Sequence, residues 1–462
     1  MLQKIKVPHT LVLLFIMMVL AQLATYILPQ GEFDTKVDAR GHTVVVPESY
    51  HEIENAERLE PWHIFTVIPR AFAETQEIIF FVFIIGGALA VLRATGMIDA
   101  FLGRLIHKYK KKPWLLIFFT MLVFSVGSST LGMAEEFIPF VPVLLILCLS
   151  LKLDNITAIG VMVVGYGIGY GVAALNPFTV LVAQEIAQLK PTSGIFYRLC
   201  LFLPFFTVGF LHVYGYAKKV YRNPEKSYLE SSPEIDLDLP DENTVIKRRD
   251  WFILVVIFLA LLLIVFGISE LSGWNWYLVE LGAVFLAVTI LVAVIARMSP
   301  DKTAIEFSNG ATELTTTALL IGFARSIALI LEDGIVLHTI VDSLASPLGK
   351  AGPELGAVGM YFIQSFINFF IPSGSGQAYV TMPLMTPIAD IAGISRQVAV
   401  LAYQFGDGFT NMIVPTNAVL MGILGIGRIP YDKWFRFIFP LIVKLWLLGS
   451  LALILAVLIG YH

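Results

Sequence analysis

The feature that most constrains this chain is a recurrence of apolar stretches, each close to the length of a membrane-spanning helix. A helix needs about 20 residues to cross roughly 30 Å of hydrocarbon, and such stretches recur along all 462 residues. The chain is 57% hydrophobic and only 14% charged, which excludes an ordinary water-soluble fold. The stretches do not alternate apolar with polar residues, as the strands of a membrane β-barrel do. We therefore predict an all-α integral membrane protein that contacts the lipid bilayer.

Several functional classes are disfavoured by the composition and by missing motifs. The formal net charge is −4 and the charges are spread among the loops, so no nucleic-acid partner is expected. The sequence contains no Walker motif, His-Glu-x-x-His pattern or Ser-His-Asp arrangement, which argues against ATP-driven transport and against an enzyme. Cys148 and Cys200 lie in apolar runs and indicate neither a disulfide nor a metal site. We expect no cofactor beyond a coupling ion, Na⁺ or H⁺.

The distribution of Lys and Arg predicts the topology, because basic residues collect in cytoplasmic loops close to the spans. Lys4 and Lys6 place the N-terminus in the cytoplasm, and basic loops then alternate with loops that are poor in Lys and Arg. We predict about nine transmembrane helices and two re-entrant hairpins. The predicted divisions are a first helix and extracellular segment at 1–62, a first repeat at 63–216 with a hairpin at 113–150 and a broken helix at 156–189, a cytoplasmic linker at 217–250, two further helices at 251–302, and a second repeat at 303–462 with a hairpin at 355–392 and a broken helix at 397–425.

The two repeats share landmarks in the same order and at nearly equal separations. The matched pairs are Gly96 with Gly334, Ser128 with Ser373, and Pro177 with Pro415. The loop at 100–112 is strongly basic whereas its counterpart at 338–354 holds one Lys and one His, so the repeat is predicted to be inverted. Inverted repeats with matched hairpins are typical of secondary transporters, which bind the solute and the coupling ion near the middle of the membrane.

Small polar residues mark the two predicted hairpin tips. A tip inside the membrane leaves backbone groups without helical partners, and these groups can bind a polar solute or an ion. The alternative is that the hydroxyls only bond to the preceding helical turn or allow close packing. The candidate residues are Ser128, Ser129 and Thr130 in the first tip and Ser373, Gly374, Ser375 and Gln377 in the second.

Each broken helix contains a Pro flanked by Asn and Thr. Proline removes a backbone hydrogen bond, which frees carbonyl groups beside the polar side chains, although a plain proline kink is the alternative. The candidate solute-binding residues are Asn176 and Thr179 around Pro177, and Asn411, Thr416 and Asn417 around Pro415. Carbonyl and Asn oxygens suit Na⁺, and the candidate sodium ligands are Ser129, Asn176, Ser375 and Asn417.

Three acidic residues, Glu135, Glu136 and Asp407, are predicted at membrane depth. An ionisable group there costs at least about 2.5 kcal/mol unless it faces water, a partner or the bundle interior. These carboxylates could attract a cationic solute, coordinate a coupling cation or carry a proton. The alternative is an internal ion pair with Arg325, which also lies within a predicted span.

Four motifs resemble the YfcC family of bacterial transporters, which is close to the DcuC anaerobic dicarboxylate carriers. They are Phe-Ile-Pro-Ser-Gly-Ser-Gly-Gln-Ala at 370–378, Gly-Asp-Gly-Phe-Thr-Asn-Met-Ile-Val-Pro-Thr-Asn at 406–417, Gly-Ser-Ser-Thr-Leu-Gly-Met-Ala-Glu-Glu at 127–136, and Asn-Pro-Phe-Thr at 176–179. The resemblance covers nearly the whole chain. It implies a multi-pass protein of the bacterial inner membrane and a homodimer. It also implies a scaffold domain, including the helices at 251–302, and a transport domain that moves as an elevator.

The resemblance leaves two main solute classes. Proteins similar to YfcC have been regarded as arginine/ornithine exchangers, whereas DcuC relatives move succinate and fumarate. The acidic pair Glu135 and Glu136 favours a cationic amino acid, while Arg325 and the helix N-termini at the tips would suit a dicarboxylate. A short peptide is a further alternative. An intramembrane enzyme that uses the two Glu and the scattered His is a remote one.

Overall fold

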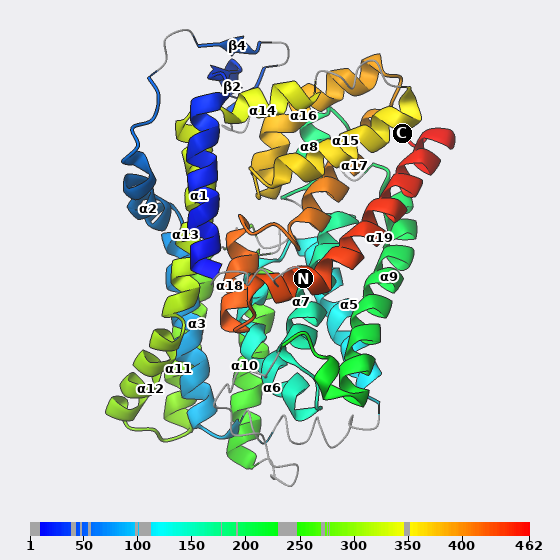
Figure 1. Cartoon of the computed structure of the whole chain (residues 1–462). Coiled ribbons are helices and arrows are strands. Elements are labelled where there is room, and N and C mark those ends of the chain that lie inside the picture. Colours follow the sequence, from blue (N-terminus) through cyan, green and yellow to red (C-terminus); the bar gives the residue numbers. More distant parts are fainter. Residues whose placement is uncertain are drawn as a thin grey trace, which may run out of the picture.

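The computed structural model describes residues 10–37, 43–46, 49–53, 57–97, 100, 112–176, 178–190, 193–229, 247–268, 273–274, 276, 278–345 and 352–462. The described chain is mostly helical, as expected (Figure 1). The helices are α1 (Thr10–Ile27), α2 (His63–Glu74), α3 (Gln76–Ala94), α5 (Pro113–Leu131), η1 (Glu135–Phe140), α6 (Val141–Ser150), α7 (Asn155–Gly171), α8 (Val180–Ile186), α9 (Ile195–Arg222), η2 (Pro224–Lys226), α10 (Arg248–Ile268), α11 (Leu278–Ile295), α12 (Pro300–Glu313), α13 (Thr315–Asp333), α14 (Leu337–Ala345), α15 (Pro353–Asn368), α16 (Gly374–Ile391), α17 (Arg396–Thr410), α18 (Ala418–Ile426) and α19 (Tyr431–Leu458).

The prediction of an all-α chain needs one correction, because the segment between α1 and α2 contains short strands. Strands β1 (Gly31–Glu32) and β4 (His51–Glu52) form one antiparallel pair, and β2 (Thr35–Val37) and β3 (Thr43–Val45) form another. The second pair is rich in the β-branched residues Thr and Val, which favour strands. The strands lie at one end of the molecule, beside α14 (Figure 1).

Two helical hairpins lie at opposite ends of the molecule. Hairpin 1 consists of α5, η1 and α6, in the lower half of Figure 1, and hairpin 2 consists of α15 and α16, in the upper half. The hairpins occupy the same place in two series of elements that follow one another along the chain. The first series is α2, α3, α5, η1, α6, α7, α8 and α9, and the second is α12, α13, α15, α16, α17, α18 and α19.

Five described helices are long and apolar enough to cross a membrane, namely α3, α5, α9, α11 and α19. The pair α12 and α13, bent by 40°, adds a sixth if it forms one span. Helices α7 and α17 are shorter than a full span, because α7 ends at Gly171 and α17 ends at Thr410. The segment between α7 and α8 is the first break, and the segment between α17 and α18 is the second break. The count of about nine crossings, which includes such broken helices, stays a prediction, as does the division of the chain into domains. Half of the predicted linker at 217–250, residues 230–246, lies outside the described residues; its described parts are the end of α9, η2 and the start of α10.

The centre of the molecule is built from α7 and α17, which are buried at almost every position. Glycine permits their contact, because a Cβ added to Gly408 would lie only 2.5 Å from the Cα of Gly171. A Cβ on Gly169 would likewise collide with the Ser125 carbonyl of α5. The two helices that precede the breaks therefore pack directly against each other and position both breaks near the middle of the molecule.

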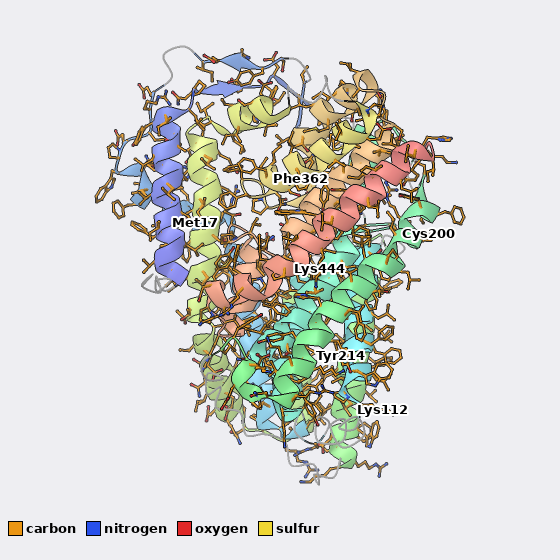
Figure 2. All side chains as sticks on the ribbon, turned by 45° about the vertical axis from the view of Figure 1, so that its right-hand side comes forward. Met17, Lys112, Cys200, Tyr214, Phe362 and Lys444 are labelled. Carbon is orange, nitrogen blue, oxygen red and sulfur yellow. The ribbon has the colours of Figure 1, made fainter. Side chains whose placement is uncertain are left out.

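The two ends of the molecule can be told apart by the start of α5 and by the C-terminal residues. Lys112, at the start of α5, lies at the end opposite the strands (Figure 2). At the other end, the Tyr461 hydroxyl donates to the Gly194 carbonyl at 2.9 Å, and the Ser395 hydroxyl donates to the Tyr461 carbonyl. The C-terminus is thereby fastened to the loops that precede α9 and α17.

Candidate functional site

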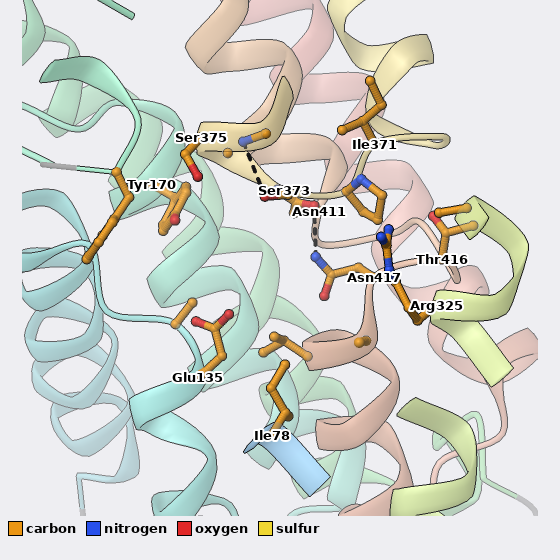
Figure 3. Close-up of a pocket in the computed structure, with 18 of the residues that line it drawn as sticks. Ile78, Glu135, Tyr170, Arg325, Ile371, Ser373, Ser375, Asn411, Thr416 and Asn417 are labelled. Carbon is orange, nitrogen blue, oxygen red and sulfur yellow. Dashed lines mark hydrogen bonds between the residues drawn. The ribbon is translucent and has the colours of Figure 1, made fainter. Parts of the chain in front are cut away.

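The tips of the two hairpins face each other across one cavity of about 680 Å³. In Figure 3, Glu135 of hairpin 1 lies on one side of the cavity, and Ser373 and Ser375 of hairpin 2 lie on the other. The volume is within the range of small-molecule sites. The polar and glycine residues that line the cavity are Thr75, Gly132, Glu135, Glu136, Tyr166, Tyr170, Arg325, Glu332, Ser373, Gly374, Ser375, Gly376, Gly408, Asn411, Thr416 and Asn417.

The tip of hairpin 1 lies further along the chain than predicted. Helix α5 continues through Leu131 and ends at Gly132, whose φ of 72° is a left-handed conformation that glycine adopts without strain. Ser128, Ser129 and Thr130 therefore form the last turn of α5, and the prediction that they form the tip is wrong. The Thr130 hydroxyl donates to the Val126 carbonyl at 2.7 Å and the residue is exposed, outside the cavity lining.

The acidic pair follows the tip of hairpin 1 at the start of η1. Glu136 is only 5% exposed and its Oε2 accepts from the Ala134 N–H at 2.9 Å, while Glu135 is half-buried and lines the cavity. Among the described residues, no Lys, Arg or His lies within ion-pair distance of either carboxylate. The sequence therefore located two carboxylates that lie beside the cavity without a basic partner among the described residues.

The alternative prediction, an ion pair between these carboxylates and Arg325, is wrong. Arg325 of α13 pairs with Glu74 at 2.9 Å and with Glu332 at 3.0 Å. The arginine lines the cavity, but its guanidinium is already shared between two carboxylates of α2 and α13.

Hairpin 2 and the second break each present the N-terminus of a helix to the cavity. Ser373 caps α16 and its hydroxyl accepts from the Gly376 N–H at 3.4 Å, so Gly374 and Ser375 form the first turn. Asn417 caps α18, and its Oδ1 accepts from the Leu420 N–H at 2.8 Å. The first N–H groups of a helix have no intrahelical acceptor and carry its positive dipole end. Both helix ends can therefore bind an anionic group.

The candidate sodium ligands are used differently from the prediction. Asn176 Oδ1 accepts two backbone N–H groups, from Phe178 at 2.8 Å and from Thr179 at 3.1 Å. Ser129 Oγ accepts from the Ala174 N–H at 3.2 Å, and Asn417 Oδ1 acts as the cap of α18. These three side-chain oxygens therefore stabilise the backbone of the two breaks by accepting backbone N–H groups. Ser375, the fourth predicted ligand, lies in the cavity wall.

Asp407 lies behind the cavity wall at the centre of an amide network. It is 0% exposed, and its Oδ1 accepts from Asn368 Nδ2 and from Asn411 Nδ2, both at 2.9 Å. Asn411 Oδ1 in turn accepts from Asn417 Nδ2 at 2.9 Å (Figure 3). Asn368 Nδ2 also donates to Gln377 Oε1 at 3.1 Å. The sequence reasoning missed Asn368, although an amide in an apolar hairpin arm was the available signal.

The candidate residues thus fall into three groups. Those that line the cavity are Glu135, Glu136, Ser373, Gly374, Ser375, Asn411, Thr416 and Asn417. Those buried outside that lining are Ser128, Ser129, Asn176, Thr179, Gln377 and Asp407. Thr130 is exposed and lies outside the lining, whereas Ser373 is exposed and belongs to it. Within the described part of the chain, no group of three or more His, Cys, Asp or Glu residues could hold a metal ion.

The apolar helices and the shared sequence of a transporter family define the chain as a multi-pass membrane transporter. The model of the family described as "DcuC: C4-dicarboxylate anaerobic carrier" matches residues 7–458. The chain therefore belongs to this family, and the resemblance noted from the motifs is confirmed.

Relatives in two bacteria cover most of the chain. A protein of Escherichia coli (strain K12), named "Putative basic amino acid antiporter YfcC", is 31% identical over 98% of this chain and 97% of its own length. An uncharacterized protein of Haemophilus influenzae is 30% identical over 90% of this chain and 82% of its own. The solved structure of Neisseria gonorrhoeae MtrF, described as one of "a Class of Antimetabolite Efflux Pumps", matches with a TM-score of 0.44 and 17% identity, over 98% of this chain and 95% of that one.

Proposed function

We propose that this chain is a secondary active transporter of the bacterial inner membrane that exchanges cationic amino acids of the arginine and ornithine type. The proposal depends on one observation: two carboxylates that have no basic partner in the described part of the chain face two helix N-termini across the cavity. An amino acid with a cationic side chain carries the two groups that this arrangement can bind. The name of the E. coli relative agrees with the same solute class.

The charges of the lining support a cation. Glu135, Glu136 and Glu332 contribute three carboxylates, and Arg325 contributes one guanidinium that is already paired. A hydrogen bond to a charged group is worth about 1.5–3 kcal/mol, so a guanidinium or ammonium group of the solute would stabilise Glu135 and Glu136. The N-termini of α16 and α18 would receive the α-carboxylate, an interaction of about 0.3–2 kcal/mol for each helix end.

A C4-dicarboxylate is the second candidate, and the description of the family favours it. Arg325 and the helix N-termini would suit its two carboxylates. Such a solute would also lie beside Glu135 and Glu136 with no cation between them, and like charges at this range repel. We therefore place it after the cationic amino acid. A short peptide carries the same two end charges as an amino acid and is a third candidate.

The same charges support exchange rather than net transport. A carrier that reoriented without cargo would have to move two unpaired carboxylates through a low-dielectric region, which costs several kcal/mol for each ion. Bound cationic cargo removes this barrier, so loaded carriers would reorient faster than empty ones. We propose an elevator movement of the two hairpins and the broken helices against α13, in a homodimer with a cytoplasmic N-terminus.

Exchange in liposomes tests the proposal. Purified protein is reconstituted into vesicles loaded with ornithine, succinate or no solute, and uptake of radiolabelled arginine is followed. We expect arginine uptake only into vesicles that contain ornithine. The variant Glu135→Gln should lose this uptake, whereas Glu225→Gln, on the exposed η2, should retain it. Succinate exchange in place of arginine exchange would support the dicarboxylate candidate and reject ours.

A further inference from the structure

Several buried oxygen atoms around Asp407 have no hydrogen-bond partner in the part of the chain that the structure describes. Among the described residues, the unpartnered atoms include Asp407 Oδ2, Asn368 Oδ1, Thr179 Oγ1 and Thr410 Oγ1. Asp407, Asn368 and Thr179 are all 0% exposed. A buried polar atom left without a partner costs about 1–3 kcal/mol, so a group of such atoms requires an explanation.

The first turn of α16, in hairpin 2, lies against Asp407 Oδ2 and against the side chain of Thr179. A Cβ added to Gly374 would lie 3.3 Å from Asp407 Oδ2 and 2.7 Å from Thr179 Cγ2. Asn368, at the end of the other arm of hairpin 2, is held by its bond to Asp407 Oδ1. Both halves of the chain therefore contribute to this location, with Thr179 from the first break and Asp407 from α17.

The charge of Asp407 has no basic partner in the described structure. Two amide N–H groups reach Oδ1, and no Lys, Arg or His among the described residues forms an ion pair with either oxygen. A buried carboxylate without a cation is destabilised by several kcal/mol. A positive charge beside Oδ2 would remove this penalty.

We propose that a sodium ion binds here, ligated by Asp407 Oδ2, Asn368 Oδ1 and the Thr179 hydroxyl under the first turn of hairpin 2. Oxygen atoms are the ligands of hard cations, and each unpartnered atom named above is an oxygen. A proton on Oδ2 would engage only one of the other oxygens. This ligand set differs from Ser129, Asn176, Ser375 and Asn417, three of which use their side-chain oxygens to hold the breaks.

The sodium site is coupled to the solute cavity through Asn411. Its Nδ2 donates to Asp407 and its Oδ1 accepts from Asn417, and both Asn residues line the cavity. Occupation beside Asp407 therefore fixes the orientation of two cavity side chains. Given the proposed function, Na⁺ and the amino acid bind cooperatively, and each raises the affinity of the other by the same factor.

The first test measures ion binding without any solute. Thermal unfolding of the purified protein in detergent is followed while Na⁺ replaces choline at constant ionic strength. A ligand that binds only the folded state raises the melting temperature, so we expect an upward shift for the original protein. We expect Asp407→Asn to lose the shift and Asp390→Asn, an exposed residue at the far end of α16, to keep it.

The second test uses two glycines of the same helical turn, so that it does not depend on the folding of the Asp407 variant. Gly374→Ala places a methyl group against Asp407 Oδ2 and Thr179, whereas in Gly376→Ala the nearest atom is Ser373 Oγ at 3.1 Å. We expect Gly374→Ala to weaken the apparent Na⁺ affinity at least about tenfold, a change of 1.4 kcal/mol, and Gly376→Ala to leave it nearly unchanged.

Two results would overturn the sodium site. One is a melting temperature that is independent of Na⁺ and depends only on pH, which would assign Oδ2 to a proton. The other is an equal Na⁺ shift in the original protein and in either the Asp407→Asn or the Gly374→Ala variant. A shift that depends on Asp407, in a protein that does not transport arginine, would keep the ion site and reject the proposed solute.

Discussion

Hairpin 1 and hairpin 2 reach the same cavity from opposite ends of the molecule, yet they present different atoms to it (Figure 3). In both, the second arm begins with a helix N-terminus beside the cavity. In hairpin 1 this first turn contains Glu135 and Glu136, and Glu136 accepts from the Ala134 N–H. In hairpin 2 the first turn is Gly374, Ser375 and Gly376, with no acidic residue. One helix end therefore carries two carboxylates in its first turn, and the other carries none.

Under the proposed function, this difference would let two similar hairpins bind a solute that has unlike ends. Two identical tips would suit a symmetric solute such as a dicarboxylate. A carboxylate tip opposite an N–H tip suits a solute with one cationic and one anionic end. Changing one tip at a time would assign to each tip its own end of the solute.

The largest effect is expected from removal of the hairpin 1 charges. The double variant Glu135→Gln with Glu136→Gln should weaken arginine binding by more than about 100-fold, because each charged hydrogen bond is worth about 1.5–3 kcal/mol. Calorimetry of the purified protein measures this affinity. The matched variant Glu225→Gln, on the exposed η2, should bind arginine as the original protein does. Unchanged arginine affinity in the double variant would contradict the assignment of the cationic end to hairpin 1.

A smaller effect is expected when hairpin 2 is given the charge of hairpin 1. Ser375→Asp places a carboxylate in the first turn of α16, where it should neutralise the helix end and repel the carboxylate of arginine. Helix-end interactions of about 0.3–2 kcal/mol predict a loss of roughly 2–30-fold in arginine affinity. Agmatine, which lacks the carboxylate, should bind at least as well as before.

The control for this change is Ser375→Asn, which is of nearly the same size as Asp and carries no charge. If Asp and Asn at this position weakened arginine equally, the effect would be steric and hairpin 2 would not be the anionic subsite. Competition of each compound against radiolabelled arginine gives the comparison directly.

The two breaks should respond differently to loss of their Asn residues. Asn176→Ala removes the acceptor of two backbone N–H groups, and Asn417→Ala removes the cap of α18. Each should lower the free energy of unfolding by about 0.5–2 kcal/mol, measured by thermal or denaturant unfolding in detergent. Only Asn417→Ala should also weaken solute binding beyond this loss, because Asn417 lines the cavity and Asn176 does not.

The smallest effect is expected at Thr130. Its hydroxyl bonds to the preceding turn and the residue is exposed, so Thr130→Ala should change the free energy of unfolding by less than about 0.5 kcal/mol and leave transport unchanged. Ser129→Ala, which removes the acceptor of the Ala174 N–H, is the buried comparison. Loss of arginine exchange in Thr130→Ala would contradict the placement of this side chain outside the solute cavity.

The local features of the fold were readable from the sequence because their causes are local. The predicted hairpin ranges, 113–150 and 355–392, nearly coincide with the ends of the two hairpins at Ser150 and Ile391. The breaks after α7 and α17 were expected from Pro and its polar neighbours. The position of the first tip was not predicted correctly, because α5 ends at Gly132 rather than among the preceding Ser and Thr residues. The short helices α2 and α12 were also missed, since each continues into a longer helix at a bend.

The sequence by itself determined that the chain lies in a membrane and where two of its helices break, because these follow from the length of apolar runs and from the backbone properties of Pro and Gly. Only the tertiary structure decided which polar atoms are left for a ligand. Arg325, Asn176 and Asn417 all bond to partners within the protein, whereas Asp407 Oδ2 and Asn368 Oδ1 have none in the described chain. Whether a polar atom is free depends on groups that are distant in sequence and adjacent in space, and packing alone brings those groups together.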